Sequence, residues 1–166
     1  MQELNGVQIK SGSSMERVVN AAKKLHLDIE LRTMDQSTRT AQQAANACGC
    51  DVAQIVKSLA FENLDNGAIT LLLVSGKHNA DLPFIEQTQQ LRLGRCDGRR
   101  VRNETGFAIG GVAPIGHLID VPIYMDETLL NYEHVWAAAG RPDSVFKVRA
   151  ADLAKSINAL MVKVTE

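Results

Sequence analysis

Lys57 is the first residue whose type and setting indicate chemistry. It follows two apolar residues and begins a strand-like run that continues through Phe61. Alternation along a strand puts Lys57, Leu59 and Phe61 on one face. If that face belongs to the core, the ammonium is partly buried, which is rare without a partner or a task. Such a lysine can hold a phosphate, polarise a carbonyl or stabilise an oxyanion. The alternative is a strand-end lysine whose head group reaches solvent.

A glycine-rich segment provides a second candidate. Residues 111–118 read GVAPIGHL, which has the G-x-x-x-x-G frame of a phosphate-binding loop. His117 and Leu118 replace the Lys and Ser/Thr that would reach phosphates and magnesium, which argues against hydrolysis of a nucleoside triphosphate. The glycines and the proline fix an unusual backbone path, and such a path can aim backbone N–H groups at a carbonyl oxygen that becomes negative during a reaction. A tight structural connection is an equally good interpretation.

Arginines gather in one short segment, where Asp97 is the acidic residue among them. The whole chain has a net charge of −1, so this cluster is a local basic patch, suited to a phosphate backbone. A solvated helix face is the alternative. A platform for stacking single-stranded bases is not expected, because the chain has only four Phe, two Tyr and one Trp. The arginine patch consists of Arg92, Arg95, Arg99, Arg100 and Arg102.

Other catalytic classes have no sequence signature here. The chain has no G-x-S-x-G elbow, and its four histidines form no H-x-x-x-H or H-E-x-x-H pair. Cys48 and Cys50 are one residue apart, which is not the spacing of redox or zinc motifs. The two thiols are interpreted as small apolar residues at a helix end. No metal or organic cofactor is predicted.

Length and composition indicate an ordinary globular protein. The 166 residues fit a single domain spanning 1–166, with 45% apolar and 22% charged residues. No apolar run approaches the ~20 residues of a membrane helix, and the first residues lack the pattern of a secretory signal. An odd number of cysteines without an export signal favours the reducing cytoplasm.

Helices and strands alternate along the chain. Capping patterns at Ser13, Thr40 and Asp51 predict three helices, the first ending near His26 and the second at Gly49. The turn signal at 65–67 joins two strands, 57–62 and 69–74, into a hairpin whose second strand is buried on both faces. This interleaving predicts an α/β domain with a mixed sheet. Further strands are expected at 29–33, 121–125 and 144–148, and further helices at 81–91, 98–104 and 151–160.

Three segments together resemble the YbaK/EbsC family, the free-standing relatives of the editing domain inserted in bacterial prolyl-tRNA synthetases. They are Lys57-Ser58-Leu59 after the apolar 51–56 stretch, the segment 105–117, and residues 135–140 with the sequence VWAAAG. The resemblance runs from about Met15 to Leu160 in the family's order and spacing. The lysine motif and the Gly-Gly-x-x-Pro-x-Gly segment form a specific pair.

The resemblance implies an aminoacyl-tRNA deacylase that acts in trans on mischarged tRNA, with the 2′-hydroxyl of the terminal adenosine helping to activate the attacking water. The implied fold has a mixed, partly barrel-like sheet surrounded by helices. Lys57 would be the catalytic residue and the arginine patch would meet the acceptor stem; the implied partners are mischarged tRNA and an aminoacyl-tRNA synthetase. The implied substrate-binding residues are Met34, Ser58, Gly110, Gly111, Val112, Ala113, Pro114, Gly116 and Gly140.

The chain also departs from the family pattern. Met34 stands where the cysteine-specific branch has a tyrosine, and the His-Pro pattern of the alanine-specific branch is missing around 135–138. These departures argue against cysteine and alanine as the amino acid removed and leave a small polar residue such as serine or threonine open. The alternative function is a non-catalytic module of the same fold that binds tRNA or a synthetase.

Overall fold

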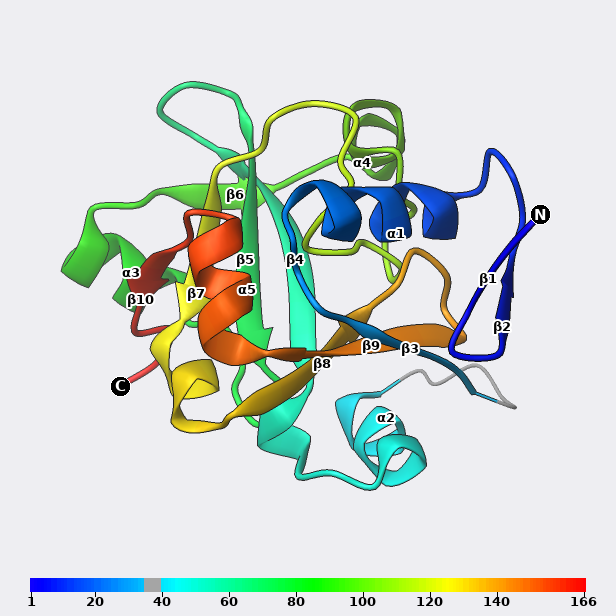
Figure 1. The fold of residues 1–166 in the computed structure, drawn as a ribbon. Coiled ribbons are helices and arrows are strands. Elements are labelled where there is room, and N and C mark those ends of the chain that lie inside the picture. The colour runs from blue at the N-terminus through cyan, green and yellow to red at the C-terminus, as the bar shows by residue number, and fades with distance from the viewer. Residues whose placement is uncertain (35–39) are drawn as a thin grey trace.

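A mixed five-stranded sheet forms the centre of the computed structural model, which describes residues 1–34 and 40–166. The strands are labelled in Figure 1, and their order in the sheet is β10-β7-β5-β4-β6. The hairpin β4–β5 is antiparallel, as predicted, whereas β7 pairs with both β5 and β10 in parallel. The strands are β4 (Val56–Asn63), β5 (Ile69–Ser75), β6 (Leu93–Arg95), β7 (Ile123–Asp126) and β10 (Leu160–Val162).

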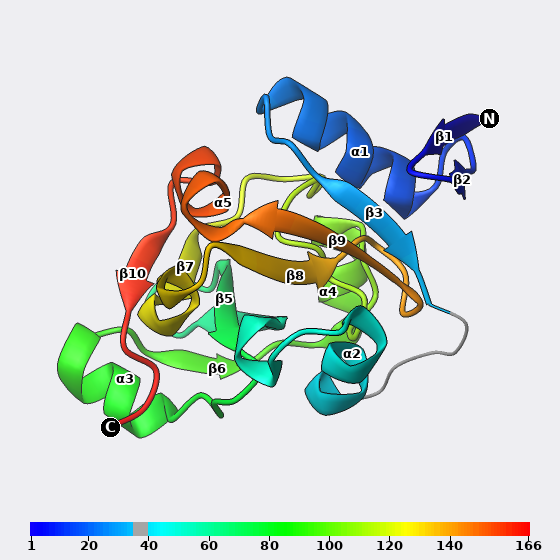
Figure 2. The same ribbon diagram turned by 60° about the horizontal axis from the view of Figure 1, so that its bottom comes forward.

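A second, antiparallel sheet has the order β3-β9-β8, and the N-terminal residues form a small hairpin, β1–β2 (Figure 2). The two larger sheets meet at a parallel bridge between Ile55 and Trp136. The fold is therefore the expected mixed α/β domain, while the partly barrel-like closure of the sheet is not confirmed. The strands are β1 (Gln2–Leu4), β2 (Val7–Ile9), β3 (Glu30–Thr33), β8 (His134–Ala138) and β9 (Ser144–Arg149).

The predicted helix caps are present. The Ser13 hydroxyl accepts from the Glu16 N–H at 3.2 Å, and both Thr40 and Asp51 begin reciprocal capping boxes. Gly49 ends its helix in the left-handed conformation that glycine adopts readily. The helices are α1 (Ser14–Lys24), α2 (Ala41–Cys48), η1 (Val52–Gln54), α3 (Leu82–Gln89), α4 (Gly98–Thr105), η2 (Glu127–Asn131) and α5 (Ala150–Ser156).

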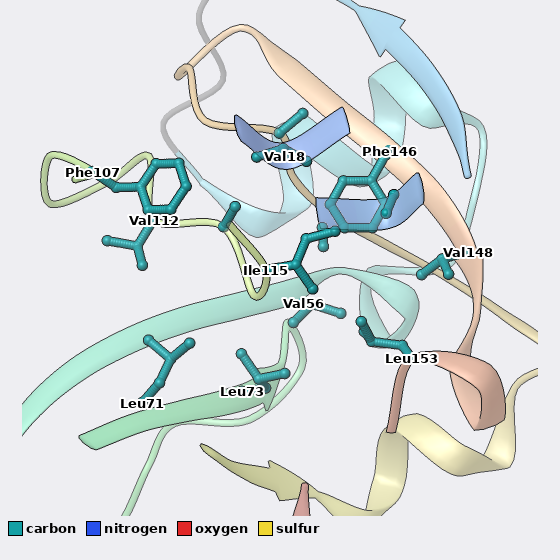
Figure 3. Packing of buried hydrophobic residues seen from close by; sticks show 14 of the residues in the cluster. Val18, Val56, Leu71, Leu73, Phe107, Val112, Ile115, Phe146, Val148 and Leu153 are labelled. Carbon is teal, nitrogen blue, oxygen red and sulfur yellow. The ribbon is translucent and has the colours of Figure 1, made fainter. Parts of the chain in front are cut away.

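The main core lies between the two larger sheets and is closed by α1 and α5 (Figure 3). Side chains of β5 alternate, so that Leu71 and Leu73 enter this core while Leu72 and Val74 pack under α3 on the opposite face. The strand is therefore buried on both faces, as predicted. A third cluster joins α2 to Trp136 on the outer face of the three-stranded sheet.

The C-terminal prediction was partly wrong. The expected helix over 151–160 ends at Ser156, and residues 160–162 instead add strand β10 to the central sheet. Pairing with β7 overrides the helical pattern at these residues. The strand was not predicted because three residues carry too short a sequence signal. No helix in the described part of the chain is long and apolar enough to cross a membrane.

Candidate functional site

A cleft of about 450 Å³ lies where the two larger sheets part. Its walls are β4, β8, the glycine-rich segment (here residues 106–117), the β8–β9 turn and the start of α2. Of the residues predicted from the sequence, four line it: Lys57, Ser58, Gly110 and Val112. The other wall residues are mostly small or apolar, including Ile55, Ala60, Ile109, Trp136, Ala137 and Ala138.

One edge of β4 is free along this cleft. The Asn63 N–H bonds to Ala68 of the β5 side, whereas the Leu64 N–H bonds to Arg92 of the β6 side. In an antiparallel ladder these directions alternate, so Val56, Ser58 and Ala60 turn their backbone N–H and C=O groups away from β5. Since β6 pairs only with residues 61–63 of β4 and the bridge between Ile55 and Trp136 joins the start of β4 to β8, the Ser58 N–H and C=O groups between these pairings face the cleft. They can bind the polar atoms of a ligand.

Lys57 is half-buried in the cleft wall, near the start of β4. Leu59 and Phe61, on the same face of β4, pack against the cluster beneath α3. This face of the strand is therefore covered. The Lys57 ammonium donates a hydrogen bond to the carbonyl of His78. Burial lowers the pKa of Lys57, while the nearby charge of Asp126 opposes that shift. The Lys57 ammonium is therefore fixed by a hydrogen bond to the protein and does not extend freely into solvent.

His78 and Asp126 form a second polar group beside Lys57. The Nδ1 atom of His78 lies 2.9 Å from Oδ2 of Asp126, a carboxylate that is only 1% exposed. The same oxygen accepts from the Ser75 N–H at 3.0 Å, and Oδ1 accepts from the Thr128 N–H at 3.0 Å. The parallel strands β5 and β7 end at the same edge of the sheet. His78 comes just after β5 and Asp126 ends β7, so the strand pairing brings the two residues together.

Ser58 and the glycine-rich segment supply polar groups that are not already used. The Ser58 hydroxyl is buried and has no hydrogen-bond partner among the described residues. The Gly111 N–H donates to the Ala108 carbonyl at 2.9 Å, whereas no partner is recorded in the described chain for the N–H groups of Gly110 and Val112. Those two amides and the hydroxyl surround the same cleft and can hold a carbonyl oxygen or a hydroxyl group.

The glycine-rich segment is anchored on both sides. Phe107, Val112 and Ile115 are buried in the main core (Figure 3). Arg17 of α1 donates to the carbonyls of Gly106 and Gly116, and its guanidinium lies 4.9 Å from the centre of the Phe107 ring. A segment held in this way presents its amides in a fixed position.

His117 fastens the far end of the segment. Its Nε2 lies 2.7 Å from the Ala113 carbonyl, and its ring packs edge-on against Phe107 at 5.7 Å. Burial lowers the pKa of His117, and the charge of Arg17 lowers it further, although the hydrogen bond to Ala113 opposes both effects. The ring is therefore held as the neutral tautomer that donates from Nε2.

Other predicted residues lie around the cleft rather than in its wall. Met34 is buried with Trp136 in the α2 cluster. Within the glycine-rich segment, Gly111, Ala113 and Pro114 are buried and do not line the cleft. Gly116 and Gly140 have φ values of +85° and +96°, and a Cβ on either would lie 3.0 Å from the backbone of α1. For these two glycines the close approach to α1 explains the residue type. Their role in substrate binding stays a prediction.

The arginine patch divides into two groups. Arg92 is paired with Asp65 and Glu86, and Arg100 with Glu62 and Glu104. In the part of the chain that the structure describes, no acidic partner is recorded for the exposed Arg95, Arg99 and Arg102. Arg99 and Arg102 line a groove of about 470 Å³ with Ala108 and Ile109. Ile109, 65% exposed, also lines the cleft, so groove and cleft adjoin.

The thiols of Cys48 and Cys50 are not activated. Burial raises the pKa of Cys48 to about 11, and it raises the pKa of Cys50 as well, so neither thiol is a ready thiolate. Within residues 1–34 and 40–166, no three His, Cys, Asp or Glu side chains gather closely enough to hold a metal ion.

The sequence did not predict several residues of this site, among them Arg17, His78, Ile109 and Asp126. Two of them had a usable signal, because His78 and Asp126 come at or just after the ends of apolar strands. Their meeting depends on β5 and β7 being parallel neighbours, which the sequence does not show. Arg17 and Ile109 had no such signal.

Comparison with known proteins identifies the family and the fold. The family model described as aminoacyl-tRNA editing domain matches residues 35–156. A solved structure described as a candidate trans-editing enzyme for prolyl tRNA synthetase is 39% identical, with a TM-score of 0.84 over 96% of this chain and 99% of that one. The structure of hypothetical protein APE2540, 23% identical, shares the fold with a TM-score of 0.80 over 90% of this chain and 99% of that one.

The chain is also similar to one curated protein. The Bacillus subtilis (strain 168) protein YwhH, itself uncharacterized, is 27% identical over 126 residues, which cover 76% of this chain and 80% of YwhH. The family match extends over more than two thirds of the chain and includes Lys57, the glycine-rich segment and β8. The chain therefore belongs to the aminoacyl-tRNA editing domain family.

Proposed function

We propose that this protein is a trans-acting aminoacyl-tRNA deacylase, which hydrolyses the ester of mischarged tRNA in the cytoplasm. The observation that carries the proposal is the cleft itself. It combines a lysine cation held by a hydrogen bond with backbone amides and a buried hydroxyl that have no recorded partner among the described residues, within mostly small, apolar walls. Such a site binds a small amino acid by size and can hold an ester carbonyl by hydrogen bonds.

The mechanism needs no protein nucleophile. Ser58, the serine on the β4 wall, has no base beside its hydroxyl in the described part of the chain, and an unassisted hydroxyl is a weak nucleophile. An aminoacyl ester is already activated, so positioning and charge stabilisation supply the catalysis. The amides of Gly110 and Val112 would hold the developing oxyanion, Lys57 would bind the terminal adenosine or the carbonyl, and the adenosine 2′-hydroxyl would help to activate water.

The adjoining groove supports a place for the nucleic acid. Phosphates before the terminal adenosine would lie along Arg99 and Arg102, and Ile109 would separate them from the ester in the cleft. The partners of the protein are then mischarged tRNA and the synthetase that releases it.

The test is deacylation of tRNAs charged with Ala, Ser, Thr, Cys or Pro. The native protein should clear one or two of these esters, and K57A should reduce that rate about 10²–10³-fold, the usual loss for a group that stabilises transition-state charge. K155A, which removes an exposed lysine of α5, is the matched control and should keep the native rate. If the native protein clears no ester but still binds tRNA, the protein is a binding module.

A further inference from the structure

Lys57 lies next to a pair formed by a buried carboxylate and a half-buried imidazole, which the proposed reaction does not use directly. The ammonium donates to the backbone carbonyl of His78, and the imidazole of the same residue bonds to Asp126. One residue therefore contacts the lysine through its backbone and the carboxylate through its side chain. His78 lies outside the described wall of the cleft, so it is not placed to touch a substrate.

The carboxylate is firmly held. Two backbone amides, from Ser75 and Thr128, bond to the two oxygens of Asp126 at 3.0 Å. The Ser75 hydroxyl in turn donates to the Ala53 carbonyl at 2.7 Å, and the His78 N–H donates to the Ser75 carbonyl at 2.9 Å. These bonds tie the turn after β5 to the end of β7, so the His78 carbonyl has a fixed position.

We propose that His78 and Asp126 are positioning residues for Lys57. The Asp126 carboxylate fixes the His78 ring, and the ring fixes the turn whose carbonyl holds one N–H of the ammonium. The other two N–H donors remain for the substrate, and the Asp126 charge favours the ammonium over the neutral amine in its half-buried setting. For catalysis, this inference rests on the proposed function; the placement of Lys57 can be tested without it.

A matched pair of variants at His78 isolates the hydrogen bond. H78L removes the donor to Asp126 and keeps an apolar side chain of similar reach, whereas H78N places an amide N–H where Nδ1 stands. Because the His78 side chain is 24% exposed, both substitutions are tolerated sterically. D126N, at a buried site, is accepted only if its thermal unfolding remains cooperative.

The first readout is the reactivity of Lys57 towards acetic anhydride, measured by mass spectrometry of its peptide. In H78L and D126N the acetylation rate should rise by about tenfold, the change in free-amine fraction for one pKa unit. In H78N it should stay near the native rate. Exposed Lys155 in the same digest is the internal control. An unchanged rate at Lys57 in folded H78L, or equal rises in H78L and H78N, would overturn the proposal.

The second readout is deacylation of the ester that the native protein clears. H78L should lower kcat about 100-fold, as small misplacements of a catalytic group do, leave KM unchanged, and be rescued by H78N. An equal loss in both variants would overturn the positioning role. If the native protein clears no ester, the proposed function fails, and the acetylation result alone still decides whether His78 and Asp126 place Lys57.

Discussion

Ser58 illustrates how a single residue can serve a site at a cost to the fold. Its hydroxyl is buried in the cleft wall and no described residue bonds to it, so folding removes the hydroxyl from water without replacing the lost hydrogen bond. Lys57, its neighbour, also carries a cost, because burial opposes its charge. Groups of this kind are retained where a ligand supplies the missing partner.

Replacing Ser58 should therefore separate stability from activity. S58A removes an unsatisfied buried hydroxyl, so the free energy of unfolding should rise by about 1 kcal/mol. The deacylation rate should fall, because a hydrogen bond to the substrate is lost. Chemical denaturation and ester hydrolysis measure the two effects.

Ser75 is the matched control for Ser58. Its hydroxyl is equally buried but donates to the Ala53 carbonyl at 2.7 Å. S75A should lower the free energy of unfolding by about 1 kcal/mol, the opposite sign. Equal destabilisation by S58A and S75A would mean that Ser58 has a structural partner.

At the scale of elements, the glycine-rich segment is held by side chains rather than by regular secondary structure. Arg17 clamps its two ends from α1, and His117 bonds back to the Ala113 carbonyl. The amides that face the cleft therefore depend on a neutral, buried imidazole. This links the shape of the segment to pH.

Acidification should destabilise the protein through His117. The folded-state pKa is lowered by burial, while the unfolded residue titrates near 6.5. Below that pH the unfolded chain binds the proton first, so the free energy of unfolding falls by up to about 1.4 kcal/mol per pH unit until the folded residue also titrates. Thermal unfolding from pH 7.5 to 5 measures this slope.

H117Q provides the comparison, because its amide can donate to Ala113 but does not titrate. Its loss of stability across the same pH range should be smaller than that of the native protein. Parallel curves for the two proteins would assign the acid sensitivity to other groups.

Local signals account for what the sequence predicts well at this scale. Ser13, Thr40 and Asp51 cap helices through bonds that span two or three residues, and the 65–67 turn joins adjacent strands. Strands β1, β2, β6 and β10 are three residues long and are set by pairing with partners, so their sequences carry little signal. For the site, Lys57 and the glycine-rich segment were identifiable from their motifs.

Contacts between distant segments were not predictable in the same way. His78 and Asp126 are 48 positions apart and meet only through strand order. The same applies to Arg17, which reaches Gly116 across 99 positions.

At the scale of the whole molecule, charge is local rather than global. The chain has a net charge of −1, yet Arg95, Arg99 and Arg102 are exposed and lack a recorded acidic partner among the described residues, two of them beside the cleft. Arg92 and Arg100 are already paired with carboxylates. The five arginines should therefore contribute unequally to a nucleic-acid partner.

Salt dependence of tRNA binding should reveal this division. Replacing Arg99 and Arg102 together with Gln should weaken binding and reduce the slope of log K against log salt by roughly 1.4–1.8, because each lost phosphate contact removes about 0.7–0.9. R92Q, at a paired arginine, is the control and should leave the slope unchanged. An equal change in both proteins would mean that the patch acts only as diffuse charge.

The place of β10 has a consequence for biosynthesis. Strand β5 is complete once residue 75 is made and α1 and α3 can cover part of it early, but the last part of its cover arrives late: Leu153 of α5 on one face and Val162 of β10 on the other. At 5–20 residues per second, the 87 residues from 76 to 162 take roughly 4–17 s to add. During that interval β5, which is apolar apart from Thr70 and Ser75, is only partly covered on the ribosome, so the nascent chain is a natural client for chaperones that bind extended apolar segments.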